Sequence, residues 1–166
     1  VQGNYSVLIT PSDHIIEPIE QYHKMIKQAQ EFVGEGRIIL FGIEPTSPHT
    51  GYGYIHTQGS SVPCTIKNFT EKPDRTTAVS YIKEGAYYWN SGLVLASAST
   101  LEQEIKNNAP EIYHCMERGL DYLLQSFSSL KSTSFDYAIL EKSTQTVMFP
   151  LSCHWSDIGS YQSLYE

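Results

Sequence analysis

The first quarter of the sequence follows a pattern that few folds can satisfy. Two short apolar runs, at residues 6–10 and 37–43, are typical of strands buried on both faces. Between them, residues 18–33 place apolar side chains along one stripe of a helix, with Pro18 suited to its first turn. Strand–helix–strand units of this length cross over right-handedly and pair their strands in parallel. The pattern therefore predicts an α/β domain that contains a parallel pair of strands.

The rest of the sequence adds antiparallel pairing, since residues 60–70 can fold back on residues 52–56 across a turn. Further strands are expected at residues 86–96 and 146–149. The expected helices comprise residues 75–84 capped by Asp74, residues 99–107 opened by a capping box at Ser99, one helix at 110–127, a short one at 135–142 capped by Ser134, and one beginning after residue 159. We therefore expect a mixed sheet in an α/β domain.

Composition narrows the class of protein. The 166 residues are 40% hydrophobic and 17% charged, which suits one globular domain or part of one. The net charge of −7 and the lack of a Lys/Arg-rich block argue against nonspecific binding to nucleic acid. Cys64, Cys115 and Cys153 are far apart, so neither a zinc site nor a disulfide framework is indicated. Because no signal peptide or long apolar span occurs, we expect a soluble cytoplasmic protein that does not enter a membrane.

A strand-like run begins within a few residues of Val1, with no lead-in. This pattern suggests a fragment whose earlier strands are missing. An unpaired first strand would expose a sheet edge, and a homo-oligomer is one possible consequence.

The segment of residues 68–74 ends an apolar run with two opposite charges. Pro73 stops the strand because it lacks a ladder donor. Adjacent residues of an extended chain point to opposite faces, so Glu71 and Lys72 are expected to pair poorly and to be available for other partners. A carboxylate accepts hydroxyl hydrogens and an ammonium neutralises phosphate, which points to a phosphorylated polyol. The alternative is a solvated strand end.

Two aspartates, Asp13 and Asp157, lie in turns near apolar strands. Ligands of open α/β sheets bind at the carboxyl ends of strands. Two carboxylates together with substrate phosphates are typical of a Mg²⁺ site, although each aspartate alone would more often be a turn residue. His14 is either a general base or a hydrogen-bonded turn histidine.

Other residues interrupt strands in ways that packing does not require. Gly53, like Gly51, indicates either close approach of a ligand or backbone, or a bulge. Asn90 breaks an aromatic strand and is either part of a bulge or a ligand contact. A hydrolytic nucleophile elbow, a Walker loop and a Gly-x-Gly-x-x-Gly fingerprint are all missing from the sequence. A glycosidase pair formed by Glu71 and Asp74 is a weak alternative, since helix capping explains the spacing.

Seven motifs follow one another along the chain: Pro11-Ser12-Asp13-His14, Phe41-Gly42-Ile43-x-Pro45, Thr50-Gly51-Tyr52-Gly53-Tyr54-Ile55, Phe69-x-Glu71-Lys72-Pro73-Asp74, Trp89-Asn90-Ser91-Gly92, Phe135-Asp136-Tyr137-Ala138-x-x-Glu141-Lys142 and Trp155-Ser156-Asp157-Ile158-Gly159-Ser160. Together they resemble the nucleotidyltransferase domain of bacterial mannose-1-phosphate guanylyltransferases, many of which are bifunctional with mannose-6-phosphate isomerase. The resemblance covers nearly the whole chain. Sister enzymes for glucose share Glu-Lys-Pro, whereas Tyr-Gly-Tyr-Ile together with Trp-Asn-Ser-Gly favours the mannose type.

The resemblance implies a Rossmann-like nucleotide-diphospho-sugar transferase fold with a mixed sheet, truncated at its N-terminus. Residues 1–166 would form the central and C-terminal part of one such domain. In this family a sugar 1-phosphate attacks the α-phosphate of a nucleoside triphosphate and expels pyrophosphate. Such enzymes act in GDP-mannose and polysaccharide biosynthesis.

The resemblance also assigns roles to six residues. Asp13 and Asp157 would hold Mg²⁺, and Asp13 and Lys72 would be the catalytic groups. Lys72 would bind the phosphate of the sugar. The sugar itself would contact Glu71, Asn90 and the backbone of Gly53. This division suits phosphoryl-type transfer, which requires positioning and charge neutralisation.

Two departures from the family pattern stand out. Ser12 occupies a position where the family usually has alanine, which leaves the carboxylate of Asp13 in place. The family's Gly-rich triphosphate loop, its base-binding residues and the isomerase domain do not occur in the sequence. We therefore expect the sugar-phosphate-binding part of an enzyme that forms GDP-mannose from GTP and mannose 1-phosphate, inactive as an isolated chain. The alternatives are a non-catalytic module that binds a sugar phosphate or nucleotide sugar, or a nucleotidyltransferase for another sugar.

Overall fold

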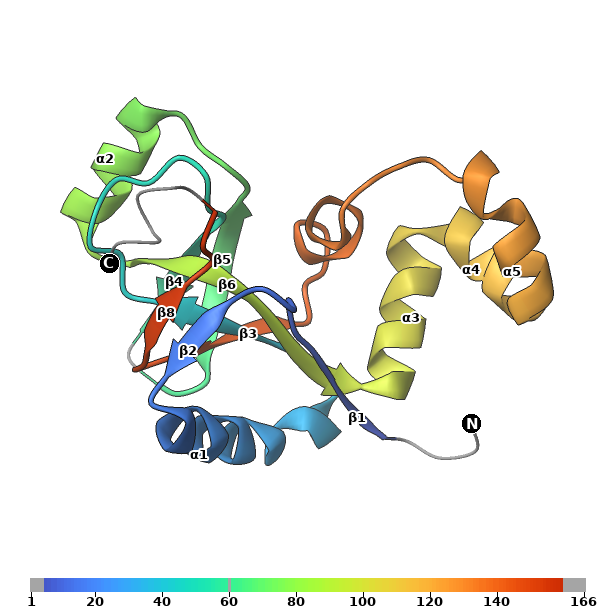
Figure 1. Ribbon diagram of the computed structural model, residues 1–166, viewed down its shortest axis with the longest axis horizontal. Helices are drawn as coiled ribbons and strands as arrows, with labels where there is room; N and C mark the ends of the chain where they lie inside the picture. The colour runs from blue at the N-terminus through green and yellow to red at the C-terminus, as the bar shows by residue number, and fades with distance from the viewer. Residues whose placement is uncertain (1–4, 60, 160–166) are drawn as a thin grey trace.

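The computed structural model describes residues 5–59 and 61–159, and Figure 1 shows their arrangement around a twisted mixed sheet. The sheet has six strands in the order β1-β6-β3-β7-β5-β4, and β6 also pairs with β4. These strands are β1 (Ser6–Ile9), β3 (Ile38–Ile43), β4 (Tyr54–Gln58), β5 (Cys64–Thr70), β6 (Tyr87–Ser97) and β7 (Thr146–Pro150). A separate two-stranded ribbon is formed by β2 (Ile15–Glu17) and β8 (His154–Ser156). The mixed α/β architecture expected from the sequence is confirmed.

The predicted parallel pair is wrong, because β1 and β3 are not neighbours. The long strand β6 lies between them and runs antiparallel to both, with Leu95 opposite Leu8 on one side and Ile39 on the other. β6 has eleven residues and offers hydrogen-bonding groups on both edges, so it can separate two strands that a local pattern would place together. The parallel neighbour of β3 is instead β7. The expected antiparallel pairing of β4 with β5 is confirmed.

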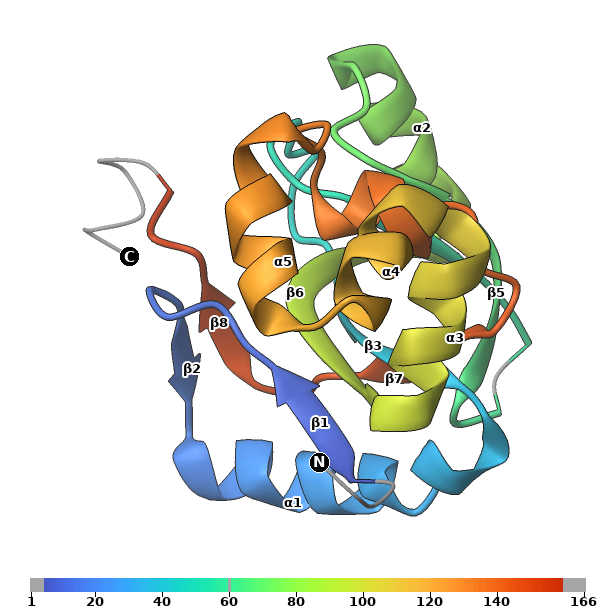
Figure 2. The ribbon, with the colours of Figure 1, turned by 90° about the vertical axis from the view of Figure 1, so that its right-hand side faces the viewer.

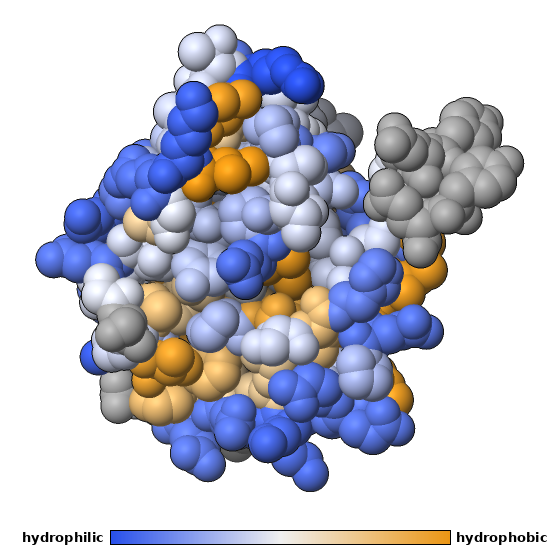
Figure 3. Space-filling model, turned by 90° about the vertical axis from the view of Figure 1, so that its left-hand side faces the viewer, coloured by the Kyte–Doolittle hydropathy of each residue, from blue (hydrophilic) through white to orange (hydrophobic). Residues whose placement is uncertain are grey.

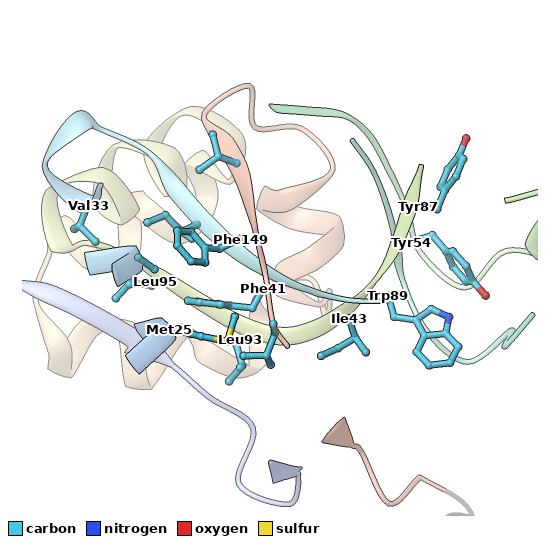
Figure 4. Close-up of a cluster of buried hydrophobic side chains, with 14 of the residues drawn as sticks. Met25, Val33, Phe41, Ile43, Tyr54, Tyr87, Trp89, Leu93, Leu95 and Phe149 are labelled. Atoms are coloured by element: carbon cyan, nitrogen blue, oxygen red, sulfur yellow. The ribbon is translucent and has the colours of Figure 1, made fainter. Parts of the chain in front are cut away.

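Helices cover both faces of the sheet, as Figures 1 and 2 show. The helices are α1 (Ile19–Gln30), α2 (Arg75–Glu84), α3 (Ala98–Asn108), α4 (Pro110–Glu117) and α5 (Leu120–Ser126), with short turns η1 (Val33–Glu35) and η2 (Phe127–Ser129) and the π-helix η3 (Asp136–Leu140). Buried residues of α1 and α2 contribute to one core cluster, part of which is shown in Figure 4. Residues of α3, α4 and η3 contribute to a second cluster. No helix among the described residues is long and apolar enough to cross a bilayer.

Three helix boundaries differ from the sequence expectations. Ser97, not Ser99, caps α3, and its Oγ accepts a hydrogen bond from Thr100 N at 3.1 Å, because the extended chain of β6 leads straight into the helix. Gly119 adopts a φ of 93°, which splits the single helix expected at residues 110–127 into α4 and α5. Pro18 is the cap residue of α1 and does not lie in its first turn. The helix expected after residue 159 lies outside the described residues.

Candidate functional site

The ribbon of β2 and β8 directs two aspartates to one end. Ile15 pairs with Ser156 in antiparallel register, so the chain before Ile15 and the chain after Ser156 leave the ribbon at the same end. Asp13 precedes this end and Asp157 follows it. The side chain of Asp13 is 80% exposed. The two carboxylates expected to act together therefore come from adjoining turns.

Asp157 is held by hydrogen bonds to one of its two oxygens. Its Oδ1 accepts from the hydroxyl of Tyr52 at 3.0 Å and from Gly159 N at 3.0 Å. The ring of Tyr52 is fixed in turn by stacking on His49, with centroids 3.9 Å apart, and by an edge contact with Trp155. Tyr52 is a site residue that sequence reasoning missed, although it lies within a quoted motif.

His14 fastens the turn of Asp13 to β8. The Nε1–H of Trp155 donates to Nδ1 of His14 at 3.2 Å, and the two rings meet edge to face. Because Nδ1 is an acceptor here, the proton of the neutral imidazole belongs on Nε2, which lies 3.9 Å from Asp13 Oδ1. This geometry agrees with the hydrogen-bonded turn histidine and leaves no unshared nitrogen lone pair for a general base.

Glu71 and Lys72 form an ion pair, contrary to the sequence expectation. Lys72 Nζ lies 3.3 Å from Glu71 Oε1. The expectation assumed an extended chain, but Lys72 has a φ of 47°, which lies in the left-handed region and brings the two side chains to the same side. The Glu71 side chain is 11% exposed and that of Lys72 is 61% exposed. A largely buried acceptor therefore lies next to an accessible cation.

The surroundings of Glu71 favour its protonated form. Burial raises the pKa of the Glu71 carboxyl above its ordinary value, and the negative charge of Asp136 adds to the increase. The hydrogen bond and charge of Lys72 oppose this increase, while Glu141 contributes in the same direction as Asp136. Asp136, like Tyr52, is a residue near the site to which sequence reasoning assigned no role.

Gly53 is required by the close approach of Glu71. A Cβ at Gly53 would lie 2.6 Å from Glu71 Oε2 and 2.9 Å from Phe69 Cζ. The carbonyl of Gly53 accepts a hydrogen bond from Asn90 N at 2.8 Å. The groups that approach Gly53 are the side chains of Glu71 and Phe69 and not another backbone, and approach of a ligand stays a prediction. The irregularity between β4 and β5 lies elsewhere, between His56 and Thr57.

Asn90 lies at an irregularity of β6. The register between β3 and β6 shifts between Leu40 and Gly42, and Gly92 has a φ of 76°. The side chain of Asn90 is held at both ends: its Oδ1 accepts from Gly92 N at 3.3 Å, and its Nδ2 donates to Asp136 Oδ1 at 3.1 Å. The bulge expected as one alternative is present, and it presents a fixed amide beside Gly53.

The predicted site residues thus fall into two adjoining groups. One contains Gly53, Glu71, Lys72 and Asn90, and the other contains Asp13 and Asp157. The two groups are linked through chain neighbours, because Tyr52 bonds Asp157 and precedes Gly53. A second link runs through Gly92, where a Cβ would lie 3.1 Å from Pro11 and 3.6 Å from His14.

A cavity of about 910 Å³ lies beside these groups and is lined by aromatic residues that include Tyr52, Trp89 and Trp155. The predicted site residues themselves do not line it. Tyr52 belongs both to the cavity wall and, through its hydroxyl, to the aspartate group. Figure 3 shows the face of the molecule that carries β2 and β8, where hydrophilic residues surround apolar ones in the lower half.

Asp74, the partner of Glu71 in the glycosidase alternative, is used to begin a helix. Its Oδ1 accepts a hydrogen bond from Thr77 N at 2.8 Å at the first turn of α2. Hydrogen bonds from Thr77 hold the pKa of the Asp74 carboxyl below its ordinary value. The capping role expected from the sequence is confirmed, and it explains the position of this carboxylate.

The donor set determines which metal could bind. Within the described ranges, no group of three or more His, Cys, Asp or Glu side chains is arranged to hold a metal ion. Asp13 and Asp157 supply two hard oxygen ligands at most. Such a pair fits Mg²⁺, which keeps several waters and completes its shell with substrate phosphates.

A family model described as nucleotidyl transferase matches residues 1–166. The chain belongs to the nucleotidyl transferase family. The mannose-1-phosphate guanylyltransferase RfbM of Salmonella typhimurium is 38% identical over 173 residues, covering 96% of this chain and 36% of that protein. The xanthan biosynthesis protein XanB of Xanthomonas campestris is 36% identical over 174 residues, covering 99% of this chain and 37% of that protein.

The fold of this nucleotidyl transferase chain also matches solved structures. A Thermus thermophilus structure titled mannose-1-phosphate geranyltransferase aligns with a TM-score of 0.89 at 28% identity, covering 96% of this chain and 48% of that one. The chain thus spans little more than a third of the curated relatives it matches and about half of this structure.

Proposed function

We propose that the chain is the sugar-phosphate-binding part of a nucleotidyltransferase that forms GDP-mannose and pyrophosphate from GTP and mannose 1-phosphate. The observation that carries this proposal is the pairing of a largely buried carboxylate, Glu71, with the exposed ammonium of Lys72 at 3.3 Å. A carboxylate in this setting accepts hydrogen bonds from sugar hydroxyls, and the adjacent ammonium neutralises a phosphate. The name of the relative RfbM supports the same sugar. The name of the relative XanB supports a place in polysaccharide synthesis.

In the proposed reaction, a phosphate oxygen of mannose 1-phosphate bonds to the α-phosphorus of GTP, and the bond to the departing pyrophosphate breaks. Lys72 would hold the attacking phosphate, while Glu71 and Asn90 would fix the sugar ring. The backbone at Gly53 would admit the sugar close to the strand. Catalysis would then come from alignment of the two phosphates and from charge neutralisation.

Asp13 and Asp157 would hold Mg²⁺ in this proposal. The bound ion would neutralise the phosphates of both substrates. Tyr52, which donates to Asp157 Oδ1, would keep that carboxylate oriented.

The test is pyrophosphate release by the full-length protein supplied with GTP, mannose 1-phosphate and Mg²⁺. Lys72→Ala should lower kcat/KM by roughly a hundredfold, because the phosphate loses its charge-assisted partner. Lys24→Ala, which removes an exposed lysine from α1, should behave as wild type.

A full-length protein that binds mannose 1-phosphate or GDP-mannose without turnover would favour the binding-module alternative. Turnover of another sugar 1-phosphate in preference to mannose would support the second alternative. The 166-residue chain alone is expected to be inactive, and guanylyl transfer by it would contradict the division of roles proposed above.

A further inference from the structure

The motif at residues 135–142 has no assigned role, although it lies against the site. It forms the π-helix η3, whose residues Ala138, Ile139 and Leu140 are buried in the core. The hydrogen bond from Ala138 N to the carbonyl of Ser134, at 2.9 Å, secures the start of the turn. Isolated π-helical turns occur frequently at functional sites. The buried residues fix the first residue of the turn, Asp136, in place.

Asp136 determines which way the Asn90 amide points. A carboxylate can only accept hydrogen bonds, so the NH₂ end of Asn90 must face it, at 3.1 Å. The carbonyl end then accepts from Gly92 N at 3.3 Å. In the flipped orientation, the Asn90 oxygen would face a carboxylate and its NH₂ would face an N–H group. The neighbouring groups therefore allow one orientation.

We propose that Asp136 is a positioning residue of the sugar-phosphate site, which fixes the Asn90 amide and places a second negative charge near Glu71. The inference rests on the function proposed above and adds a residue to it. Asp136 reaches the sugar through Asn90 and Glu71 rather than by direct contact. Its effect is on how tightly, and over which pH range, the sugar is held.

The charge of Asp136 has a consequence with a definite sign. The charged groups that act on Glu71 are Lys72, Asp136 and Glu141, and Asp136 is the larger of the two acidic contributions. Glu71 must be ionised to accept two hydroxyl hydrogens, so sugar binding weakens as the pH falls through its raised pKa. Removal of the Asp136 charge lowers that pKa, and the loss of binding moves to lower pH.

Two substitutions separate the hydrogen bond from the charge. Asp136→Asn keeps an oxygen that can accept from Asn90 Nδ2 but removes the charge. Asp136→Ala removes both. Asp121→Asn, at an exposed aspartate of α5, is the matched control for the charge change. All variants are made in the full-length protein.

Calorimetric titration with mannose 1-phosphate over a pH series gives the first readout. Asp136→Ala should weaken binding about tenfold at neutral pH, and combining it with Asn90→Ala should cost no more than Asn90→Ala alone. Asp136→Asn should bind within about threefold of wild type at neutral pH. As the pH falls, this variant should lose affinity at a lower pH than wild type does. The control Asp121→Asn should bind as wild type does. An Asp136→Ala titration that overlaps that of wild type would overturn the proposal.

A second readout needs no ligand. Carbon-detected NMR can follow the Glu71 carboxyl, which should titrate at lower pH in Asp136→Asn than in wild type. In Asp121→Asn, the Glu71 carboxyl should titrate as in wild type. An unchanged Glu71 titration in folded Asp136→Asn would overturn this inference alone. Failure of the wild-type protein to bind mannose 1-phosphate would instead overturn the proposed function, so the two failures are distinguishable.

Discussion

Gly53 and Glu71 meet so closely that a Cβ on Gly53 would lie 2.6 Å from Glu71 Oε2. The strand residue and the acidic side chain therefore depend on each other. Any side chain at Gly53 would collide with both the carboxylate of Glu71 and the aromatic ring of Phe69.

Gly53→Ala should consequently damage the site more than the fold. We expect the KM for mannose 1-phosphate to rise by about tenfold to a hundredfold, since a shift of about 1 Å at a positioning group has effects of that size. Steady-state kinetics of the full-length protein provide the measurement. Gly34→Ala is the control, because a Cβ there meets nothing within 4 Å. Equal kinetics for the two variants would contradict the proposed role of this contact.

The hydroxyl of Tyr52 orients a carboxylate proposed to bind metal. Tyr52→Phe keeps the ring that stacks on His49 but removes the donor to Asp157 Oδ1. The Mg²⁺ concentration needed for half-maximal activity should rise roughly tenfold to a hundredfold, as for other partners of metal ligands. The control is Tyr122→Phe on α5, where the tyrosine ring lies under Arg118. This variant should leave the Mg²⁺ requirement unchanged. An unchanged Mg²⁺ requirement in Tyr52→Phe would argue against metal binding by Asp157.

The cap of α2 should make stability depend on pH at acid values. The folded-state pKa of Asp74 is lowered, so its contribution is present above the unfolded value of about 3.9 and is lost as the pH falls through the folded pKa. Asp74→Ala should therefore melt a few degrees below wild type at neutral pH, and the difference should shrink at strongly acid pH. Asp74→Asn retains a capping oxygen and should melt closer to wild type. The measurement is the melting temperature by calorimetry over a pH series. A difference between Asp74→Ala and wild type that does not change with pH would contradict capping by the Asp74 carboxylate.

Local sequence patterns predicted much of this fold. The strands β4, β5 and β7 and the helix α2 lie where periodicity and caps placed them, because those signals act over a few residues. The pairing of β1 with β6 could not be predicted in this way. It depends on a strand more than eighty residues away, and the local pattern favoured β3 as the nearest partner.

In the site too, local features could be predicted from the sequence and contacts between distant residues could not. Gly53 and Asn90 could be recognised because each residue is unusual for a strand interior. The ion pair of Glu71 with Lys72 could not be foreseen, since it depends on one left-handed residue at Lys72. Tyr52 and Asp136 act through contacts with Asp157 and Asn90 that are distant in sequence. Sequence motifs contained both residues, but only the folded chain gives their partners.

The central claim is that Glu71 and Lys72 bind a sugar phosphate. Its most direct test is the Kd of mannose 1-phosphate for the full-length protein, measured by calorimetry for wild type, Lys72→Ala and the control Lys24→Ala. We expect wild type to bind mannose 1-phosphate, Lys72→Ala to bind it about tenfold or more weakly, and Lys24→Ala to bind it as wild type does. Equal affinities for wild type and Lys72→Ala would contradict the proposed role of Lys72, as would a wild-type protein that binds no mannose 1-phosphate.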